Sequence, residues 1–468
     1  MKSAQFFKGL SWLIFLNLLV KPVWIFAIDR QVQNIVGHQT YGSYFALVSL
    51  SFVLLFIADA GLGNMLTQRL AAKEVFSTVQ LLQLKFLLLL LYCIVCCFIA
   101  WLTHVSQWDL LLQIMAIQIL GSLFLFLRSL LTAHQLYTTD AVFSVVDKGL
   151  LILLCGGFIY GIFDPISLTI FVQLQAATTA FAVIMLFIVL VRKRIFTSEH
   201  KQPLPTLLKW TLPFALIIFL MSVHYKLDAF LLERLHPAGA LQAGIYASAF
   251  RLLDAANMVG YLSASFLVPF IARHKADRAG VQEVLLTTRH VLLLFAITVS
   301  CFAFQFAPWI QQLFYHSSNS QTTRVLQLCL LALPACYLVH VYGAALTATA
   351  NFRLFNTILL GAVVVNILLN LWLIPVYGAL GCCMAALASQ YSCGIALSIA
   401  VTQKLRFSYA ATSFLLYALT AAVLLLLFYY SKMAVNNVWI ILAATAFLIA
   451  VVLVTQRTVF KKLLFSLK

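Results

Sequence analysis

Long apolar runs separated by short polar connections set the pattern of this 468-residue chain. Stretches such as Leu81 to Leu91 lack the sustained two-residue alternation of a β-barrel strand. Lipid offers no partner to backbone N–H and C=O groups, so apolar runs of about 20 residues predict helices that cross a bilayer. The fourteen predicted spans are 9–28, 42–66, 80–101, 109–131, 141–162, 166–191, 208–231, 242–270, 290–313, 325–348, 355–374, 378–402, 411–430 and 438–455. The pattern predicts an all-α, polytopic membrane protein.

Composition supports the bilayer as the solvent of this chain. Hydrophobic residues make up 63% of it and charged residues 9%, whereas about 25% of a soluble domain is charged. The mean hydropathy is +1.02. The net charge of +17 fits the Lys and Arg excess of cytoplasmic loops better than a nucleic-acid-binding surface. All ten cysteines fall in apolar stretches without zinc-ligand spacing, so we interpret them as small apolar residues.

The distribution of basic residues predicts the orientation. If the N-terminus is cytoplasmic, most of the 30 Lys and Arg residues fall on the cytoplasmic side, among them Lys85, Arg128 and Arg289. We therefore expect a protein of the bacterial cytoplasmic (inner) membrane with both termini in the cytoplasm. The first span meets Lys21 and Pro22 instead of a small-residue cleavage pattern, so we interpret it as an uncleaved helix.

A basic connection at 192–206, which carries Pro203 and Pro205, is typical of a linker and divides the chain. We predict a six-helix lobe on each side of this linker and two further helices with a basic cytoplasmic tail at the end. The predicted boundaries are 1–200, 201–405 and 406–468.

A short internal echo fits this division. Asp29 is followed by Tyr-Gly-Ser-Tyr-Phe-Ala at 41–46, and Asp228 is followed by Ala-Gly-Ile-Tyr-Ala at 243–247. Each segment lies near the exit of one predicted span and the start of the next. Transporters are often built from such repeats, with the substrate path between them.

Charged residues within spans concentrate in the first two spans of each predicted lobe. Each costs about 2.5–3.5 kcal/mol on insertion scales, so such residues usually face a cavity or a partner. The candidate substrate-binding cations are Lys21, Arg30, Lys226 and Arg251. The candidate residues for charge balance or ion coupling are Asp29, Asp59, Asp228 and Asp254. A diphosphate suits the basic set, because Arg and Lys donate strong charge-assisted hydrogen bonds to phosphate oxygens.

These charges also have a structural interpretation, which stays open. Arg251 and Asp254 are three residues apart on one helix face and can pair. Asp29, Arg30, Glu233 and Arg234 can lie in the outer headgroup region. Polar side chains elsewhere in the spans can join helices together instead of binding sugars.

Other functional classes fit the sequence less well. A cation or drug antiporter favours isolated acids, to which Asp59 and Asp147 come closest. A membrane glycan polymerase or ligase usually needs a long outer loop, and the predicted outer loops are short. The sequence has no metal triad, Gly-rich phosphate loop or nucleophile elbow, and so many buried charges disfavour a helical scaffold without transport.

Two stretches resemble Wzx-type polysaccharide flippases. The first joins Asn34 to Gly37, Tyr41 to Tyr44 and Ala58-Asp-Ala-Gly-Leu-Gly63. The second runs from Asn366 through Asn370 and Ile374-Pro-Val-Tyr-Gly378 to Gly381. In addition, 228–251 is similar to the corresponding region of the lipid II flippase MurJ, in which Arg251 matches a basic residue of the central cavity. Cys382 and Cys383 stand where the family usually has Ala-like residues.

The resemblance implies the fold of multidrug/oligosaccharidyl-lipid/polysaccharide (MOP) exporters, related to MATE transporters. Two six-helix lobes would form a V, and two helices would follow them. It implies a transporter that flips an undecaprenyl-diphosphate-linked glycan between leaflets by alternating access, for O-antigen, lipopolysaccharide or other surface polysaccharide. We expect no cofactor beyond a coupling H⁺ or Na⁺. The expected partners are the lipid-linked glycan, membrane lipid and other polysaccharide-assembly membrane proteins.

Overall fold

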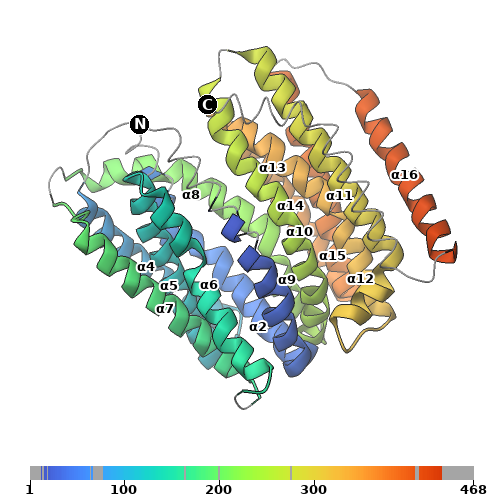
Figure 1. Cartoon of the computed structure of the whole chain (residues 1–468), viewed down its shortest axis with the longest axis horizontal. Coiled ribbons are helices and arrows are strands. Elements are labelled where there is room, and N and C mark those ends of the chain that lie inside the picture. The colour runs from blue at the N-terminus through green and yellow to red at the C-terminus, as the bar shows by residue number, and fades with distance from the viewer. Residues whose placement is uncertain are drawn as a thin grey trace. The chain divides into compact units, whose positions relative to one another are not determined.

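The computed structural model describes residues 12, 15–17, 19–63, 65–66, 77–162, 165–198, 201–274, 277–405 and 411–434. Every regular element in these residues is helical, which confirms the all-α prediction (Figure 1). The elements are η1 (Trp24–Asp29), α2 (Arg30–Asp59), α4 (Thr78–Leu102), α5 (Trp108–Ala133), α6 (Tyr137–Ile159), α7 (Leu168–Arg192), α8 (Leu204–Lys226), α9 (Asp228–Leu235), α10 (Gly239–Arg273), α11 (Arg278–Phe314), α12 (Ser320–Leu331), α13 (Leu333–Ala348), α14 (Phe352–Tyr377), α15 (Ala379–Leu405) and α16 (Ala411–Ala434).

The predicted count of fourteen spans is approximate. In the described residues, 11 helical stretches are long and apolar enough to cross a membrane, or 12 with the bent α8. One of them, Phe15–Asp59, includes most of the first two predicted spans, 9–28 and 42–66, and contains Gly37, whose φ of 80° breaks the helix. Helices α12 and α13 together form one span, Ser320–Ala348. The predicted span 438–455 lies outside the described residues.

The chain forms two compact units, 1–244 and 245–468. In unit 1, α2 packs against α4, α5, α8 and α9, and α5 packs against α7. In unit 2, α15 packs against α13 and α14, and α11 packs against α12, α13 and α16. The lobe boundaries after residues 200 and 405 stay predictions.

Exposed apolar side chains identify the lipid-facing surfaces. On α4, Leu90, Ile94 and Phe98 recur every four residues, and each is more than half exposed. Side chains four residues apart lie on the same helix face. Such a stripe would be costly in water but matches a lipid environment. The chain is therefore a multi-pass membrane protein.

Helix α2 ends sharply after Asp59. Ala60 and Gly61 both adopt left-handed backbone conformations, with φ of 40° and 74°, which stops the α-helical hydrogen-bond pattern. A side chain at Gly61 would also meet the backbone of α8, because its Cβ would lie 2.9 Å from the Thr211 carbonyl oxygen. This turn places the Asp59 carboxylate at the end of the helix.

The connection that follows α7 returns to the start of α4. Thr78 donates its hydroxyl to the Ile195 carbonyl (3.0 Å) and accepts from the Thr197 N–H (2.7 Å). The Gln80 side chain forms a two-way pair with the Gln202 backbone, since Nε2 donates to the carbonyl (2.6 Å) and Oε1 accepts from the N–H (2.9 Å). We call the described residues of this connection, 195–198 and 201–202, the α4 strap.

Candidate functional site

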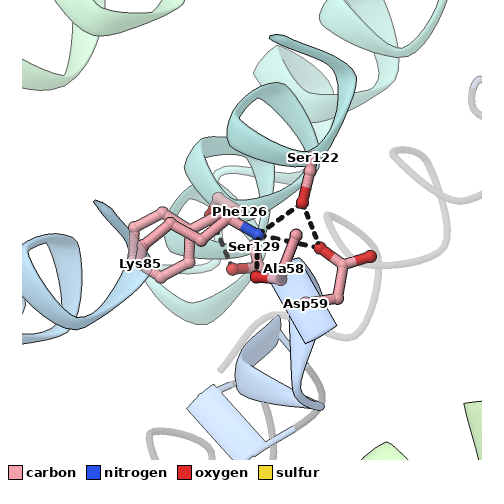
Figure 2. A network of polar contacts seen from close by, with 6 residues as sticks. All are labelled: Ala58, Asp59, Lys85, Ser122, Phe126 and Ser129. Carbon is pink, nitrogen blue, oxygen red and sulfur yellow. Dashed lines mark hydrogen bonds and ion pairs between the residues drawn. The ribbon is translucent and has the colours of Figure 1, made fainter. Parts of the chain in front are cut away.

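A charged cluster in unit 1 joins Asp59, Lys85 and Ser122 from three helices (Figure 2). Lys85 Nζ donates to Asp59 Oδ1 (2.8 Å), the Ala58 carbonyl (2.9 Å) and Ser122 Oγ (2.6 Å). Ser122 Oγ in turn donates to Asp59 Oδ1 at 2.5 Å. An ammonium group has three donors, so these three acceptors satisfy it completely.

Each member of the cluster is held by local structure. The left-handed turn after α2 presents Asp59, and Lys85 lies two turns into α4 with only 1% of its side chain exposed. The Phe126 ring of α5 lies 6.0 Å from the Lys85 ammonium; both side chains are drawn in Figure 2. Lys85 also caps α2, because its bond to the Ala58 carbonyl occupies an acceptor left over at the helix end. The cluster therefore ties the end of α2 to α4 and α5.

Sequence reasoning found Asp59 but missed Lys85 and Ser122. It assigned Lys85 to the basic residues of the cytoplasmic connections, whereas the structure buries this residue inside α4. Its position within a leucine-rich run is a signal that could have marked it. Asp59 is not isolated, as an antiporter carboxylate would be, although 28% of its side chain is exposed.

Asp29 is buried in η1, the π-helical turn that precedes α2. The Tyr41 hydroxyl donates to its Oδ2 at 2.7 Å. Tyr41 itself is fully buried and lies beyond Gly37. The hydrogen bond therefore connects the segments on the two sides of the helix break.

The predicted cations of unit 1 lie in different settings. Lys21 is exposed and Arg30 is half-buried. Lys226 is half-buried at the end of α8, with its ammonium 5.8 Å from the Phe52 ring and 5.0 Å from the Tyr225 ring. The Ser49 hydroxyl of α2 donates to the Lys226 carbonyl. Asp228, which is buried, begins α9.

The remaining predicted site residues lie on α10 in unit 2. Arg251 and Asp254 are both half-buried, one turn apart. Their proposed contacts with cargo, like those of the unit 1 cations, stay predictions.

Other charged residues of unit 1 pair in the way that the structural interpretation expected. Arg128 Nε lies 2.7 Å from Asp140 Oδ1 and joins α5 to α6. Lys148 pairs with Asp147 at 3.4 Å and lies over the Trp24 ring at 5.4 Å. Asp147 is therefore no isolated acid. These contacts account for several buried charges without a ligand.

Glu233 and Arg234 lie in α9, beyond the span formed by α8. Glu233 Oε2 and Arg234 Nε are 2.8 Å apart. Burial raises the pKa of the Glu233 carboxyl, and the neighbouring Arg234 charge opposes that rise. This pair was placed in the outer headgroup region by the sequence analysis, a placement that stays a prediction.

Unit 2 contains a buried cation that sequence reasoning also missed. Arg289 of α11 is 3% exposed and donates to the Tyr342 hydroxyl of α13 at 3.1 Å. Its guanidinium lies 6.0 Å from the Tyr417 ring of α16, and the Tyr417 hydroxyl is hydrogen-bonded to His290. Within the described part of the chain, groups of three or more His, Cys, Asp or Glu side chains that could hold a metal ion are absent.

A model of the polysaccharide biosynthesis protein family matches residues 6–275, which is more than half of the chain. The chain belongs to this family. No curated protein sequence matches this family member significantly.

Solved structures identify the fold of this family member. The lipid II flippase MurJ, in an inward closed conformation, matches with a TM-score of 0.71 at 14% identity and covers 96% of this chain and 99% of its own. An inward-facing multidrug resistance MATE transporter of the MOP superfamily matches with a TM-score of 0.61 at 13% identity, over 87% and 98%. The Vibrio cholerae MATE transporter VcmN, in its bent form, matches with a TM-score of 0.55 at 16% identity, over 86% and 97%. At these identities the likeness establishes the MOP fold alone, and with the family match it confirms the predicted resemblance.

Proposed function

We propose that this protein flips an undecaprenyl-diphosphate-linked oligosaccharide from the cytoplasmic to the outer leaflet of the bacterial cytoplasmic membrane, for surface polysaccharides such as O-antigen, capsule or exopolysaccharide. The match of residues 6–275 to the polysaccharide biosynthesis family carries this proposal. The MurJ-like fold supports it, since that relative is a lipid II flippase. Both termini of the chain would be cytoplasmic.

In the proposed cycle, Lys21, Arg30, Lys226 and Arg251 neutralise the diphosphate while the polyprenyl tail stays in lipid. The half-buried position of Lys226 beside two aromatic rings supports a role for it. A cation partly removed from water forms stronger contacts with phosphate than one at the surface. Asp29, Asp228 and Asp254 would balance these cations when the path is empty.

Asp59 is the proposed ion-coupling residue, with H⁺ or Na⁺ as the ion. Its Oδ1 accepts from Lys85 and Ser122, while the side chain keeps 28% exposure. A carboxylate that is both paired and accessible can exchange a proton or cation as its partner moves. An Asp59→Asn variant should remove any dependence of transport on a proton or sodium gradient.

Deletion of the gene tests the proposed function. The expected result is loss of surface polysaccharide together with accumulation of lipid-linked oligosaccharide that is accessible only from the cytoplasmic side. Both defects should be reversed by the wild-type gene on a plasmid. Intact surface polysaccharide with no accumulated intermediate, in a strain that lacks other flippases of this family, would contradict the proposal.

Arg251 tests the proposed cargo site. Arg251→Ala should reduce transport about 100-fold at unchanged protein level, because a charge-assisted phosphate contact in a dry site contributes about 3 kcal/mol. Arg251→Lys should retain part of the activity. Arg353→Ala is the matched control, since Arg353 is exposed at the start of α14. Normal transport by Arg251→Ala would remove this residue from the site.

A cation or drug antiporter is the second candidate, favoured by the similarity of the fold to MATE transporters. A deletion strain would then become more sensitive to cationic dyes and drugs while its surface polysaccharide stayed normal. The same deletion strain therefore distinguishes the two candidates.

A further inference from the structure

The exposed face of α10 differs from the helix faces that lie in lipid. On α14, Leu360, Val364 and Leu368 recur every four residues and are 47% to 61% exposed. On α10, the same spacing brings Tyr261 and Ser265 to the surface. Beyond the first turn of α10, whose residues are all described, Tyr261 is the only exposed large hydrophobic side chain, at 65%. This face of α10 therefore lacks the aliphatic side chains that mark contact with lipid elsewhere in the protein.

Tyr261 lies deep in its span. It comes five residues after Ala256, the middle residue of α10 (Gly239–Arg273), and five residues of helix are about 8 Å long. For a helix centred in a hydrocarbon core about 30 Å thick, this position is well inside the core, not at the interface where Tyr usually anchors a helix. Among the described residues, the Tyr261 hydroxyl has no hydrogen-bond partner. Since lipid tails offer none, the position favours water or a polar ligand.

The neighbour of the Tyr261 ring is His340 of α13. The two ring centroids are 6.3 Å apart and the ring planes meet at 78°, so the rings lie edge to face. His340 Nε2 is hydrogen-bonded to Asn257 Oδ1 at 3.1 Å. The other ring nitrogen, Nδ1, has no hydrogen-bond partner among the described residues. A ligand that lies on Tyr261 can therefore also form a hydrogen bond with His340.

Helix α13 fixes the part of α10 that carries Tyr261. A Cβ on Gly260 would lie 2.6 Å from Cδ1 of the Tyr337 ring and 3.0 Å from Cδ2 of His340, so only glycine allows this close approach. The Tyr337 hydroxyl donates to the Ala256 carbonyl at 2.7 Å. Successive side chains of an α-helix point about 100° apart around its axis. The contact at Gly260 therefore turns Tyr261 away from α13 and holds the backbone beneath it.

The groups around Tyr261 match the surface of a sugar ring. A sugar has apolar C–H faces and a rim of hydroxyl groups, so aromatic rings and hydrogen-bonding side chains can hold it together. Besides His340, the half-buried carboxylate of Asp254 belongs to this face of α10. It precedes Tyr261 by seven residues, about two helical turns or 10 Å. Arg251, the proposed diphosphate contact, lies one turn further along α10.

We propose that Tyr261 is a sugar-contacting residue of the transport path, which receives the C–H face of a sugar ring on its exposed ring while His340 Nδ1 hydrogen-bonds a sugar hydroxyl. This inference deepens the proposed function and rests on it, because the sugar belongs to the lipid-linked glycan. Arg251 contacts the diphosphate that all such lipids share, whereas Tyr261 contacts the part that differs between glycans. Tyr261 therefore contributes to the choice of cargo.

Binding of two lipids to the purified protein in nanodiscs tests this proposal. The first is undecaprenyl diphosphate, and the second is the undecaprenyl-diphosphate-linked oligosaccharide extracted from the deletion strain. Tyr261→Leu should weaken binding of the second lipid about tenfold, because the stacking contact is lost. It should leave binding of the first lipid unchanged, since that lipid has no sugar. Tyr261→Phe and Tyr261→Trp keep an aromatic ring and should keep most of the affinity.

Tyr430→Leu is the matched control. Tyr430 lies on α16 and is 64% exposed, nearly as much as Tyr261. This variant should bind both lipids like the wild type, which accounts for any general effect of removing an exposed Tyr. Arg251→Ala should instead weaken binding of both lipids, because it removes a diphosphate contact.

The outcomes separate the sugar contact from the proposed function. Unchanged binding of the glycosylated lipid to Tyr261→Leu would overturn the sugar contact and leave the function standing. An equal loss for both lipids would also overturn it, because Tyr261 would then contact the polyprenyl chain or the diphosphate. A loss in Tyr261→Phe as large as in Tyr261→Leu would exclude stacking. A wild-type protein that binds neither lipid, or a deletion strain that yields no glycosylated lipid, would contradict the proposed function and the inference with it.

Discussion

Lys85 and Arg289 are buried cations on corresponding helices of the two units, yet they meet different partners. Lys85 lies on α4, which follows α2 in unit 1, and Arg289 lies on α11, which follows α10 in unit 2. Both donate to a hydroxyl on a later helix of the same unit: Lys85 to Ser122 on α5, and Arg289 to Tyr342 on α13. Both also lie 6.0 Å from an aromatic ring.

The difference is the carboxylate. Lys85 is paired with Asp59, whereas the guanidinium of Arg289 is received by Tyr342 and the face of Tyr417. The charge of an ammonium group is concentrated on one nitrogen, so a buried Lys needs an anion or an acceptor for each of its N–H donors. The charge of a guanidinium group is delocalised, so a buried Arg can also stack on aromatic rings. The two units therefore bury a cation with different partners. In the described clusters, loss of the unit 1 cation leaves the Asp59 carboxylate without its cation, whereas loss of Arg289 leaves Tyr342 and Tyr417.

The largest effect should come from Lys85→Met. The change leaves the Asp59 carboxylate without its ion-pair partner, which costs about 2–3 kcal/mol, less than for a fully buried pair because Asp59 is 28% exposed and keeps its bond from Ser122. The matched substitution Arg289→Met should cost less, because the groups that receive Arg289 are neutral. Thermal unfolding of the purified proteins in one detergent measures both. Equal losses would show that the carboxylate is not what distinguishes the two regions.

The double variant Lys85→Met with Asp59→Leu sharpens the same comparison. Replacing both charges by apolar groups removes the unpaired carboxylate, so the double variant should be more stable than Lys85→Met alone, by about 1–3 kcal/mol of coupling. The measurement is a double-mutant cycle on unfolding temperature. Additive losses would mean that the two side chains act independently.

The smallest effect should come from Tyr417→Phe. The ring stays beneath Arg289, and the variant loses the hydroxyl, which contacts both His290 and Arg289, so the expected cost is about 1 kcal/mol. Tyr417→Ala should cost about 1 kcal/mol more, because the cation–π contact goes as well. Thermal unfolding measures both variants, and equal destabilisation of the two would mean that the ring contributes nothing to holding Arg289.

The sequence predicted the helices well because the bilayer restricts the backbone so strongly. The predicted span 109–131 corresponds to α5, Trp108–Ala133, and the predicted span 355–374 corresponds to α14, Phe352–Tyr377. The predicted span 42–66 extends beyond the end of α2, because Ala60-Gly-Leu is apolar and a hydropathy pattern cannot show that its backbone forms a left-handed turn. Apolar periodicity marks where the chain lies in lipid, not where a helix stops within it.

The partners of charged residues could not be predicted, because they depend on how helices are rotated about their axes. Asp59 was recognised as a candidate, but the depth at which Lys85 lies in α4 decides that the two meet. The echo around Gly42 and Gly244 was visible in the sequence, whereas the contact between its two copies appears only in the structure. Both the Asp59–Lys85 pair and the contact between the two echo segments join residues that are far apart in the chain.

The α4 strap has a mechanical consequence for the long connection that was predicted as a linker. The Gln80 side chain hydrogen-bonds both the N–H and the carbonyl of Gln202, so the connection between α7 and α8 is anchored to α4 at this residue. Pro203, with its backbone angle restricted by the ring, is the next residue, and α8 begins at Leu204. The start of α8 is therefore fixed to α4 by the two Gln80–Gln202 hydrogen bonds and by the restricted φ of Pro203, so we expect a displacement of α4 to be passed on to α8.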